Sequence, residues 1–259
     1  AQGLPQGGQA EGLRLGLVGD PVAQFDNSGQ LTSVQTPNIK LVGPGSGTVE
    51  LVRVWATGYG NWNNAWQASR ITGGGFSELH ILDSTFDEPK AVGVDGASFP
   101  AHGISVTVPF VLVANSTVTG GGWADILYAL TSGKDGLAGI SANGTLVPID
   151  SVITGGPGWG GKYYPGALPH GGCPCPSLGG KGGPGIVCSV LFTSGSRLTG
   201  GPAGIPWDAY AGPMGKQPDG PPTIVGSKID LVQSITTSTP PQINANWTIN
   251  YAPPPGPAV

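Results

Sequence analysis

The apolar residues of this chain fall in short runs that recur in groups of three. In the clearest group, a run at 104–106 is followed by a run at 111–113 and then by the segment 116–119. The same order returns at 139–154 and at 185–199. The separation from the leading glycine to the serine of the third run is 13, 12 and 11 residues in these groups. This near-constant offset indicates a repeated unit of three short strands separated by two turns.

Weaker groups flank these three. One spans 71–86, one begins at Ile39, and one spans 223–236, while Leu13–Leu17 through Val34 is an expected opening unit. In each unit the first two connections are tight and the third is long and variable. Such short strands cannot bury a face alone, but stacking the units lets every strand pair with its equivalent about 4.8 Å away.

The predicted fold is therefore all-β. It is a right-handed parallel β-helix of about six to seven coils, because parallel crossovers are right-handed, with long Gly/Pro-rich loops on one side. We expect residues 1–37 to form an N-terminal arm with a first coil, 38–236 the β-helix, and 237–259 a Pro-rich tail with one strand.

One segment, "STVTGGGW" from Ser116, returns as "SVITGGPGW" from Ser151, "SRLTGG" from Ser196 and "SRITGGG" from Ser69. We interpret its middle apolar residue as a core residue flanked by small polar ones. The glycines that follow are expected to let the chain leave the stack with positive φ, and to let neighbouring units approach closely.

Composition limits the classes of protein that fit. The 259 residues include 47 glycines and 26 prolines, but 38% are hydrophobic, which argues against a disordered chain. The formal net charge is -4 with no basic stripe, so a nucleic-acid partner is not expected. No apolar run approaches the roughly 20 residues that span a bilayer. The start at Ala1-Gln2 fits a mature secreted product, so a secreted or cell-surface location is expected.

The units "GI-x-V … S-x-[VIL]-T-G-G" at 103–121, 139–156 and 185–201 resemble those of secreted bacterial Gly-rich β-helix proteins of the pectate-lyase-like superfamily. The resemblance covers roughly residues 38–236. It implies architecture rather than activity, and many such proteins are surface or matrix components.

Aromatic residues concentrate on the long connections, which carry five of the seven tryptophans. Loops held by a rigid scaffold are a usual place for binding, and aromatic residues are enriched in interfaces. We therefore single out as candidate ligand- or partner-binding residues Trp62, Trp66, Trp123, Trp159, Tyr163, Tyr164, Trp207 and Tyr210. The alternative is that these side chains only pack the loops onto the stack.

Catalytic chemistry is sparse in the sequence. The densest acidic cluster is Asp83, Asp87 and Glu88, with His80 close by. His102-Gly103 is similar to the His-Gly of pectin-cleaving hydrolases, but the Asp signatures that accompany it there are absent. We predict no catalytic residues, no metal site and no cofactor, and expect that the chain is not an enzyme.

Three cysteines leave several arrangements open. Cys188 is a candidate for a disulfide with Cys173 or Cys175, which an oxidising compartment would allow. A zinc site with His170 and free thiols are the alternatives.

The tail contains one amphipathic segment between prolines. Residues 242–251 alternate apolar and polar, so we expect a strand that covers its own stack or adds to a neighbour's sheet, with assembly residues Ile243, Trp247, Ile249 and Tyr251. The predicted function is that of an extracellular structural or adhesive protein that self-associates into a fibre through its termini and loops. The alternative is a carbohydrate-binding module, with a glycan as partner, or a polysaccharide lyase-like enzyme on a β-helix.

Overall fold

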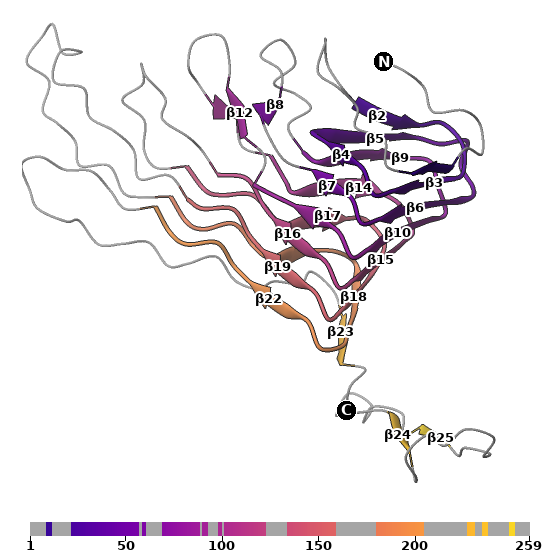
Figure 1. Cartoon of the computed structure of the whole chain (residues 1–259). Coiled ribbons are helices and arrows are strands. Elements are labelled where there is room, and N and C mark those ends of the chain that lie inside the picture. The colour runs from indigo at the N-terminus through magenta and orange to yellow at the C-terminus, as the bar shows by residue number, and fades with distance from the viewer. Residues whose placement is uncertain are drawn as a thin grey trace, which may run out of the picture.

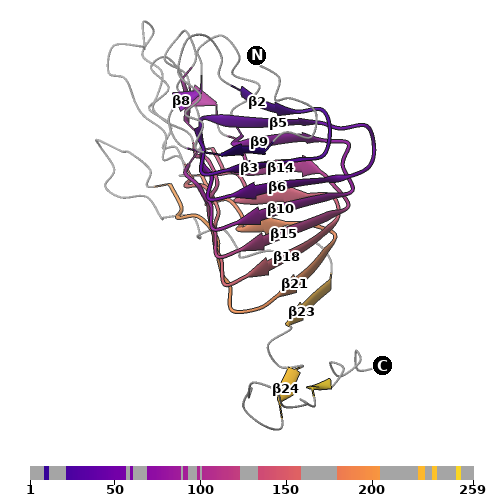
Figure 2. The same cartoon turned by 45° about the vertical axis from the view of Figure 1, so that its right-hand side comes forward.

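The fold is an all-β parallel solenoid. The computed structural model describes residues 9–11, 22–56, 59–60, 69–88, 90–92, 98–99, 101–122, 134–158, 180–204, 227–230, 235–237 and 249–251. Three parallel sheets, here called A, B and C, run along the stack with eight, six and six strands (Figures 1 and 2). The predicted β-helix is thus confirmed.

The strands of each sheet follow one another in chain order. Sheet C consists of β2 (Val22–Phe25), β5 (Asn38–Val42), β9 (Ile71–Gly74), β14 (Ile104–Thr107), β17 (Ile140–Ala142) and β20 (Ile186–Val187). Sheet A consists of β1 (Gln9–Glu11), β3 (Gly29–Thr32), β6 (Thr48–Val52), β10 (Glu78–Leu82), β15 (Phe110–Ala114), β18 (Thr145–Ile149), β21 (Val190–Thr193) and β23 (Ser227–Asp230). Sheet B consists of β4 (Gln35–Thr36), β7 (Trp55–Ala56), β11 (Thr85–Phe86), β16 (Thr117–Thr119), β19 (Val152–Thr154) and β22 (Arg197–Thr199).

Each coil takes one strand from sheet C, then one from A, then one from B, which gives six complete coils. The first coil is β2, β3 and β4, so it begins at Val22. The expected opening segment Leu13–Leu17 lies outside the described residues. The coil count and the strand order within a coil agree with the sequence pattern.

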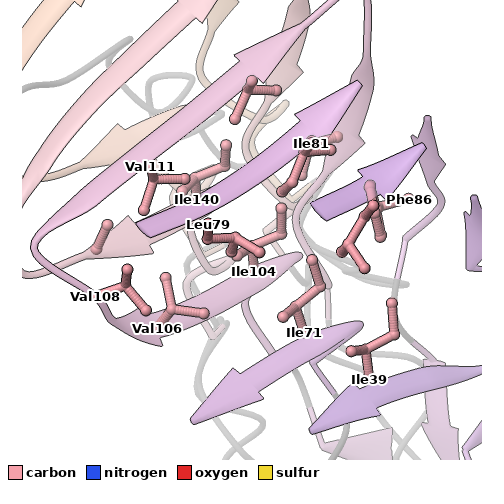
Figure 3. Close-up of a cluster of buried hydrophobic side chains, with 14 of the residues drawn as sticks. Ile39, Ile71, Leu79, Ile81, Phe86, Ile104, Val106, Val108, Val111 and Ile140 are labelled. Atoms are coloured by element: carbon pink, nitrogen blue, oxygen red, sulfur yellow. The ribbon is translucent and has the colours of Figure 1, made fainter. Parts of the chain in front are cut away.

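The core is a set of apolar columns, one residue per coil. Ile39, Ile71, Ile104, Ile140 and Ile186 lie one above another in sheet C, and all are fully buried. Figure 3 shows the first four of them. Alternate residues of sheet A point inward in the same way, which is why its five-residue strands have the burial pattern of alternating intermediate and buried positions. One continuous core therefore runs the length of the stack.

The turn between sheets A and B repeats one backbone geometry in every coil. One residue per turn has positive φ, between 46° and 61°. These residues are Ser33, Arg53, Asp83, Asn115, Asp150 and Gly195. Such a conformation is costly for residues other than glycine, although Asn and Asp tolerate it. Its recurrence at the same place in each coil shows that the turn is a fixed part of the repeat.

The residue after this turn forms a ladder of serines, of which Ser84, Ser116 and Ser151 are buried and Ser196 is partly exposed. In sheet-B order the position holds Ser84, Ser116, Ser151 and Ser196, preceded by Val34 and Val54. The Ser84 backbone N–H donates to Ser116 Oγ at 3.0 Å, and the Ser116 N–H donates to Ser151 Oγ at 3.1 Å. Each hydroxyl in turn donates to a carbonyl two residues back in its own coil, for example Ser116 Oγ to Ala114 O at 2.7 Å. The serine of the repeated segment is thus an interior, hydrogen-bonded residue, a role the sequence did not reveal.

Two details of the repeated segment differ from expectation. The copy at Ser69 lies at the start of β9 in sheet C, whereas the copies at 116, 151 and 196 lead into sheet B. The prediction that the glycines leave the stack with positive φ is wrong for those three copies. Among the described glycines, positive φ occurs at Gly45, Gly47, Gly73, Gly75 and Gly195.

Smaller elements lie outside the three long sheets. β8 (Tyr59–Gly60), β12 (Lys90–Val92) and β13 (Ser98–Phe99) form a three-stranded sheet within the connections that follow the second and third coils. Figure 1 labels β8 and β12. At the other end of the stack, β23 continues sheet A beyond the sixth coil. β24 (Ile235–Thr237) does not continue sheet B and pairs antiparallel with β25 (Ile249–Tyr251).

Candidate functional site

The glycine-rich segments at the corner between sheets B and C form a second hydrogen-bonded structure beside the solenoid. We call it the glycine array and define it as residues 101–103, 120–122, 134–139, 155–158, 180–185 and 200–204. Three of these segments leave sheet B and three return to sheet C. In Figure 1 the three outgoing segments run side by side from β16, β19 and β22.

Within the array, segments that run in the same direction bond along the stack. On the outgoing side, the Gly155 N–H donates to Thr199 O and the Gly158 N–H donates to Pro202 O. The returning side repeats this pattern, with Gly136 to Lys181 O and Gly139 to Pro184 O. In both cases donors three residues apart bond to the same neighbouring segment.

Other N–H groups of the array connect outgoing segments to returning segments. The Leu137 N–H donates to Gly121 O, Gly156 to Leu137 O, and Gly183 to Gly156 O, at 2.7–3.1 Å. Along each segment, the N–H groups point to the same neighbour at every third residue. A polyproline II-like chain has three residues per turn and produces this pattern, whereas a β-strand alternates with a period of two. The outgoing and returning layers are thereby joined into one block.

Glycine is required in the array because the backbones touch. A methyl group at Gly156 would overlap the carbonyl of Gly121, and one at Gly183 would overlap the carbonyl of Leu137. The expectation that small residues at this corner allow close approach is therefore confirmed, although the reason is backbone packing rather than turn geometry.

The array is also tied to the third coil. The Glu88 carboxylate accepts the Gly122 N–H at 3.2 Å. Arg70, which is almost fully buried, donates to the carbonyls of Pro37, Asp87 and Glu88 at 2.9–3.2 Å. Burial lowers the pKa of the Arg70 guanidinium to about 10, while the charges of Asp87 and Glu88 act in the opposite direction. The side chain therefore stays charged at neutral pH and fastens the corner by hydrogen bonds to main-chain oxygens.

His102 is built into the returning layer. Its Nδ1 accepts the Ala138 N–H at 3.1 Å. Burial lowers the pKa of His102 from the ordinary value of 6.5. This contact gives the histidine a structural role in joining two coils.

On the outer face of sheet A, His80 lies between Glu78 of its own strand and Glu50 of the neighbouring coil. Its Nε2 is 3.0 Å from Glu78 Oε2, and its Nδ1 is 3.6 Å from Glu50 Oε1. The ring packs edge-on against Phe110, with the ring centroids 6.2 Å apart. This cluster stands on a flat sheet face, and within the described part of the chain no group of three His, Cys, Asp or Glu residues has the arrangement of a metal site.

Cys188 occupies a core position in the sixth coil. It is a free thiol in the structure and is buried, and this burial raises its pKa to about 11. A thiol with this pKa is a poor nucleophile at neutral pH. Cys173 and Cys175, its candidate partners, lie outside the described residues, as does His170.

None of the eight aromatic residues singled out from the sequence lies in the described part of the chain. Trp123 and Trp159, however, directly follow Gly122 and Gly158, the last described residues of two outgoing segments of the array. Of the four assembly candidates, Ile249 and Tyr251 lie in β25, whereas Ile243 and Trp247 are outside the described residues. The array, which sequence reasoning missed as a structure, is therefore the base from which two candidate aromatic segments start.

Among the described residues there is no helix long and apolar enough to cross a membrane.

A scan against protein-family models and searches of curated proteins and of solved structures found no match to this chain. The similarity of its repeat units to those of the pectate-lyase-like superfamily stays a prediction.

Proposed function

We propose that this chain is a structural and adhesive protein of the cell surface, in which a rigid solenoid holds aromatic loop segments against an external target. The observation that carries the proposal is the glycine array. Its two layers are bonded both along the stack and across it, so the bases of three consecutive loops are fixed relative to one another. A rigid base lowers the entropy lost on binding, which favours affinity.

The aromatic residues supply the contact chemistry in this proposal. Tryptophan and tyrosine offer large, amphipathic surfaces with few rotatable bonds. Trp159 directly follows the array at Gly158, and Tyr163 and Tyr164 come within the same connection. A glycan surface is the second candidate target, because aromatic faces also stack on sugar rings.

Binding of the purified protein to a glycan array and to whole cells tests the proposal. Trp159→Ala should reduce binding at least tenfold, since a buried aromatic contact is commonly worth more than about 1.4 kcal/mol. Trp55→Ala is the matched control, because Trp55 is an exposed tryptophan on β7, in sheet B. Equal binding by both variants and the unmodified protein would refute a role for the Trp159 loop.

Fibre formation is a separate part of the proposal. A solenoid has two open ends, and a contact between unlike ends of two copies generates a filament. Electron microscopy of the whole protein and of a variant lacking residues 237–259 tests whether the tail drives assembly. Unchanged filaments in the shortened variant would contradict strand exchange through the tail.

A further inference from the structure

The turn between β17 and β18, in the fifth coil, contains the one Asn-Gly pair of the sequence, Asn143-Gly144. Asn143 is exposed and Gly144 is half-buried. The pair connects the end of a sheet-C strand to the start of a sheet-A strand, so it lies at an outer corner of the solenoid. Glycine after asparagine leaves the main-chain nitrogen open to the asparagine side chain, because glycine has no side chain of its own to obstruct the approach.

Packing requires the glycine at position 144. A Cβ there would overlap the carbonyl of Pro109, in the fourth coil. This carbonyl also accepts the Thr145 N–H at 2.8 Å, so it cannot move aside without losing that hydrogen bond. On the other side, the Gly144 carbonyl accepts the N–H of Ser189, in the sixth coil, at 3.2 Å. The fold therefore keeps a glycine directly after Asn143.

The two groups of this pair that can react with each other are both without hydrogen bonds. Among the described residues, neither the Gly144 N–H nor the Asn143 side-chain amide has a hydrogen-bond partner. The carbonyl of the same peptide group, Asn143 O, accepts the Ser189 hydroxyl at 2.8 Å. When the Gly144 nitrogen loses its proton, negative charge spreads to this carbonyl oxygen. A hydrogen-bond donor aimed at the oxygen stabilises that charge.

We propose that Asn143-Gly144 is a site of spontaneous covalent modification, at which the asparagine is converted into aspartate and isoaspartate. The deprotonated Gly144 nitrogen attacks the side-chain carbonyl carbon of Asn143. The carbon–nitrogen bond of the side-chain amide then breaks, and its nitrogen takes up a proton and leaves as ammonia. Water opens the resulting five-membered succinimide at either of its two carbonyl carbons, which gives aspartate or isoaspartate. The net reaction consumes one water and releases one ammonia, and it needs no oxidant or enzyme.

Asn115-Ser116, at a turn between sheets A and B, is an exposed asparagine that lacks these features. Its following nitrogen belongs to a buried residue, and the Ser116 N–H donates to Ser151 Oγ at 3.1 Å. Asn115 itself has a φ of 48°, and its N–H donates to Ile149 O at 3.0 Å. Folding therefore blocks the reaction at Asn115 and leaves it open at Asn143.

Isoaspartate changes the corner more than aspartate does. Its main chain runs through the side-chain carbonyl and is one atom longer, so the carbonyls of residues 143 and 144 cannot both keep their hydrogen bonds to Ser189. Aspartate leaves the length of the main chain unchanged and adds only a negative charge at an exposed position. The isoaspartate form therefore loosens the contact between the fifth and sixth coils at this corner.

Peptide mapping by mass spectrometry tests the proposal in the full chain, incubated at neutral pH either folded or unfolded in guanidinium chloride. Local sequence alone sets both rates in the unfolded chain, so the ratio of folded to unfolded rate isolates the effect of the structure at each site. The proposal expects folding to slow the reaction at Asn115 at least tenfold and the reaction at Asn143 by less than threefold. Equal slowing at the two sites, or a tenfold slowing at Asn143, would overturn it.

Hydrogen exchange measures the consequence for the fold. The Ser189 amide should exchange at least tenfold faster in aged protein that contains isoaspartate than in fresh protein. Freshly prepared Asn143→Asp is the matched control, because it carries the same new charge on an unchanged main chain and should leave this amide protected. Equal exchange of the Ser189 amide in the aged and fresh proteins would refute the loosening of the corner.

Discussion

At the scale of single residues, the repeat depends on a few positions where polar groups are buried but fully bonded. The ladder serines each accept a main-chain N–H from the coil above and donate to a carbonyl of their own coil. A buried hydroxyl whose donor and acceptor groups are both hydrogen-bonded lowers the stability of the fold little. Removing it destabilises the fold, because its buried partner is left without a hydrogen bond. This is why serine can stand in the interior of a short, glycine-rich corner.

The ladder can be tested at Ser116. Ser116→Ala should lower the free energy of unfolding by about 1–3 kcal/mol, because the buried Ser84 N–H loses its acceptor. Urea unfolding measures the change. The neighbouring Thr117→Ala removes an exposed side chain and should change stability by less than about 0.5 kcal/mol. Equal effects of the two substitutions would contradict the ladder.

His102 gives the protein a pH-dependent stability. Its pKa is lower in the folded chain than the ordinary 6.5, so below about pH 6.5 the unfolded chain binds the extra proton first. Stability should therefore be fully present above pH 6.5 and fall as the pH drops toward the folded-state pKa. Urea midpoints between pH 5 and 8 for the unmodified protein and His102→Gln measure this. A variant that loses stability on acidification as steeply as the unmodified chain would show that His102 is not the cause.

At the scale of elements, the protein joins two kinds of extended chain. In the sheets, residues alternate inward and outward, and the apolar columns fix the register. In the glycine array, hydrogen-bond partners recur every third residue, and burial comes from backbone against backbone. The two meet at Thr119, Thr154 and Thr199, where the Thr154 and Thr199 hydroxyls lie 3.1 Å apart.

The array predicts a strong effect of a single methyl group. Gly156→Ala should destabilise the protein by about 1–3 kcal/mol, because the new Cβ meets the Gly121 carbonyl rather than a movable side chain. Thermal or urea unfolding measures the loss. Lys181→Ala, which trims an exposed side chain in the same array, is the control and should be close to neutral. A neutral Gly156→Ala would mean that the two layers are not in contact.

Sequence patterns predicted the sheets because the physical cause is local and periodic. The isoleucines at 104, 140 and 186 recur at the same place in each unit, so the strands and their stacking could be read directly. The serine ladder could not, since nothing in hydropathy marks a buried serine. The array could not either, because glycine carries no side-chain pattern and its packing depends on chains brought together only after the coils stack. The copy at Ser69 shows the limit of prediction from a sequence motif, because the same motif that leads into sheet B elsewhere leads into sheet C there.

At the scale of the whole molecule, the solenoid presents faces of different character. The outer face of sheet A is polar in the early coils, with Gln30, Glu50 and His80, and apolar in the later ones, with Leu112, Val147 and Phe192 in the same column. The glycine array occupies a separate corner, between sheets B and C. A protein built in this way keeps its loop bases on a single rigid column, which is the property that the proposed adhesive function requires.

The stacking of six coils in register is the central claim, and electron spin-echo distances along one outer column of sheet C test it most directly. Gln24, Lys40, Thr72, Ser105, Ser141 and Val187 are successive neighbours in that column. With the native cysteines replaced, spin labels at Gln24 and Ser141 should lie about 19 Å apart, and labels at Gln24 and Val187 about 24 Å apart, since each coil adds about 4.8 Å. Distances that do not grow by one strand spacing from the first pair to the second would contradict the solenoid.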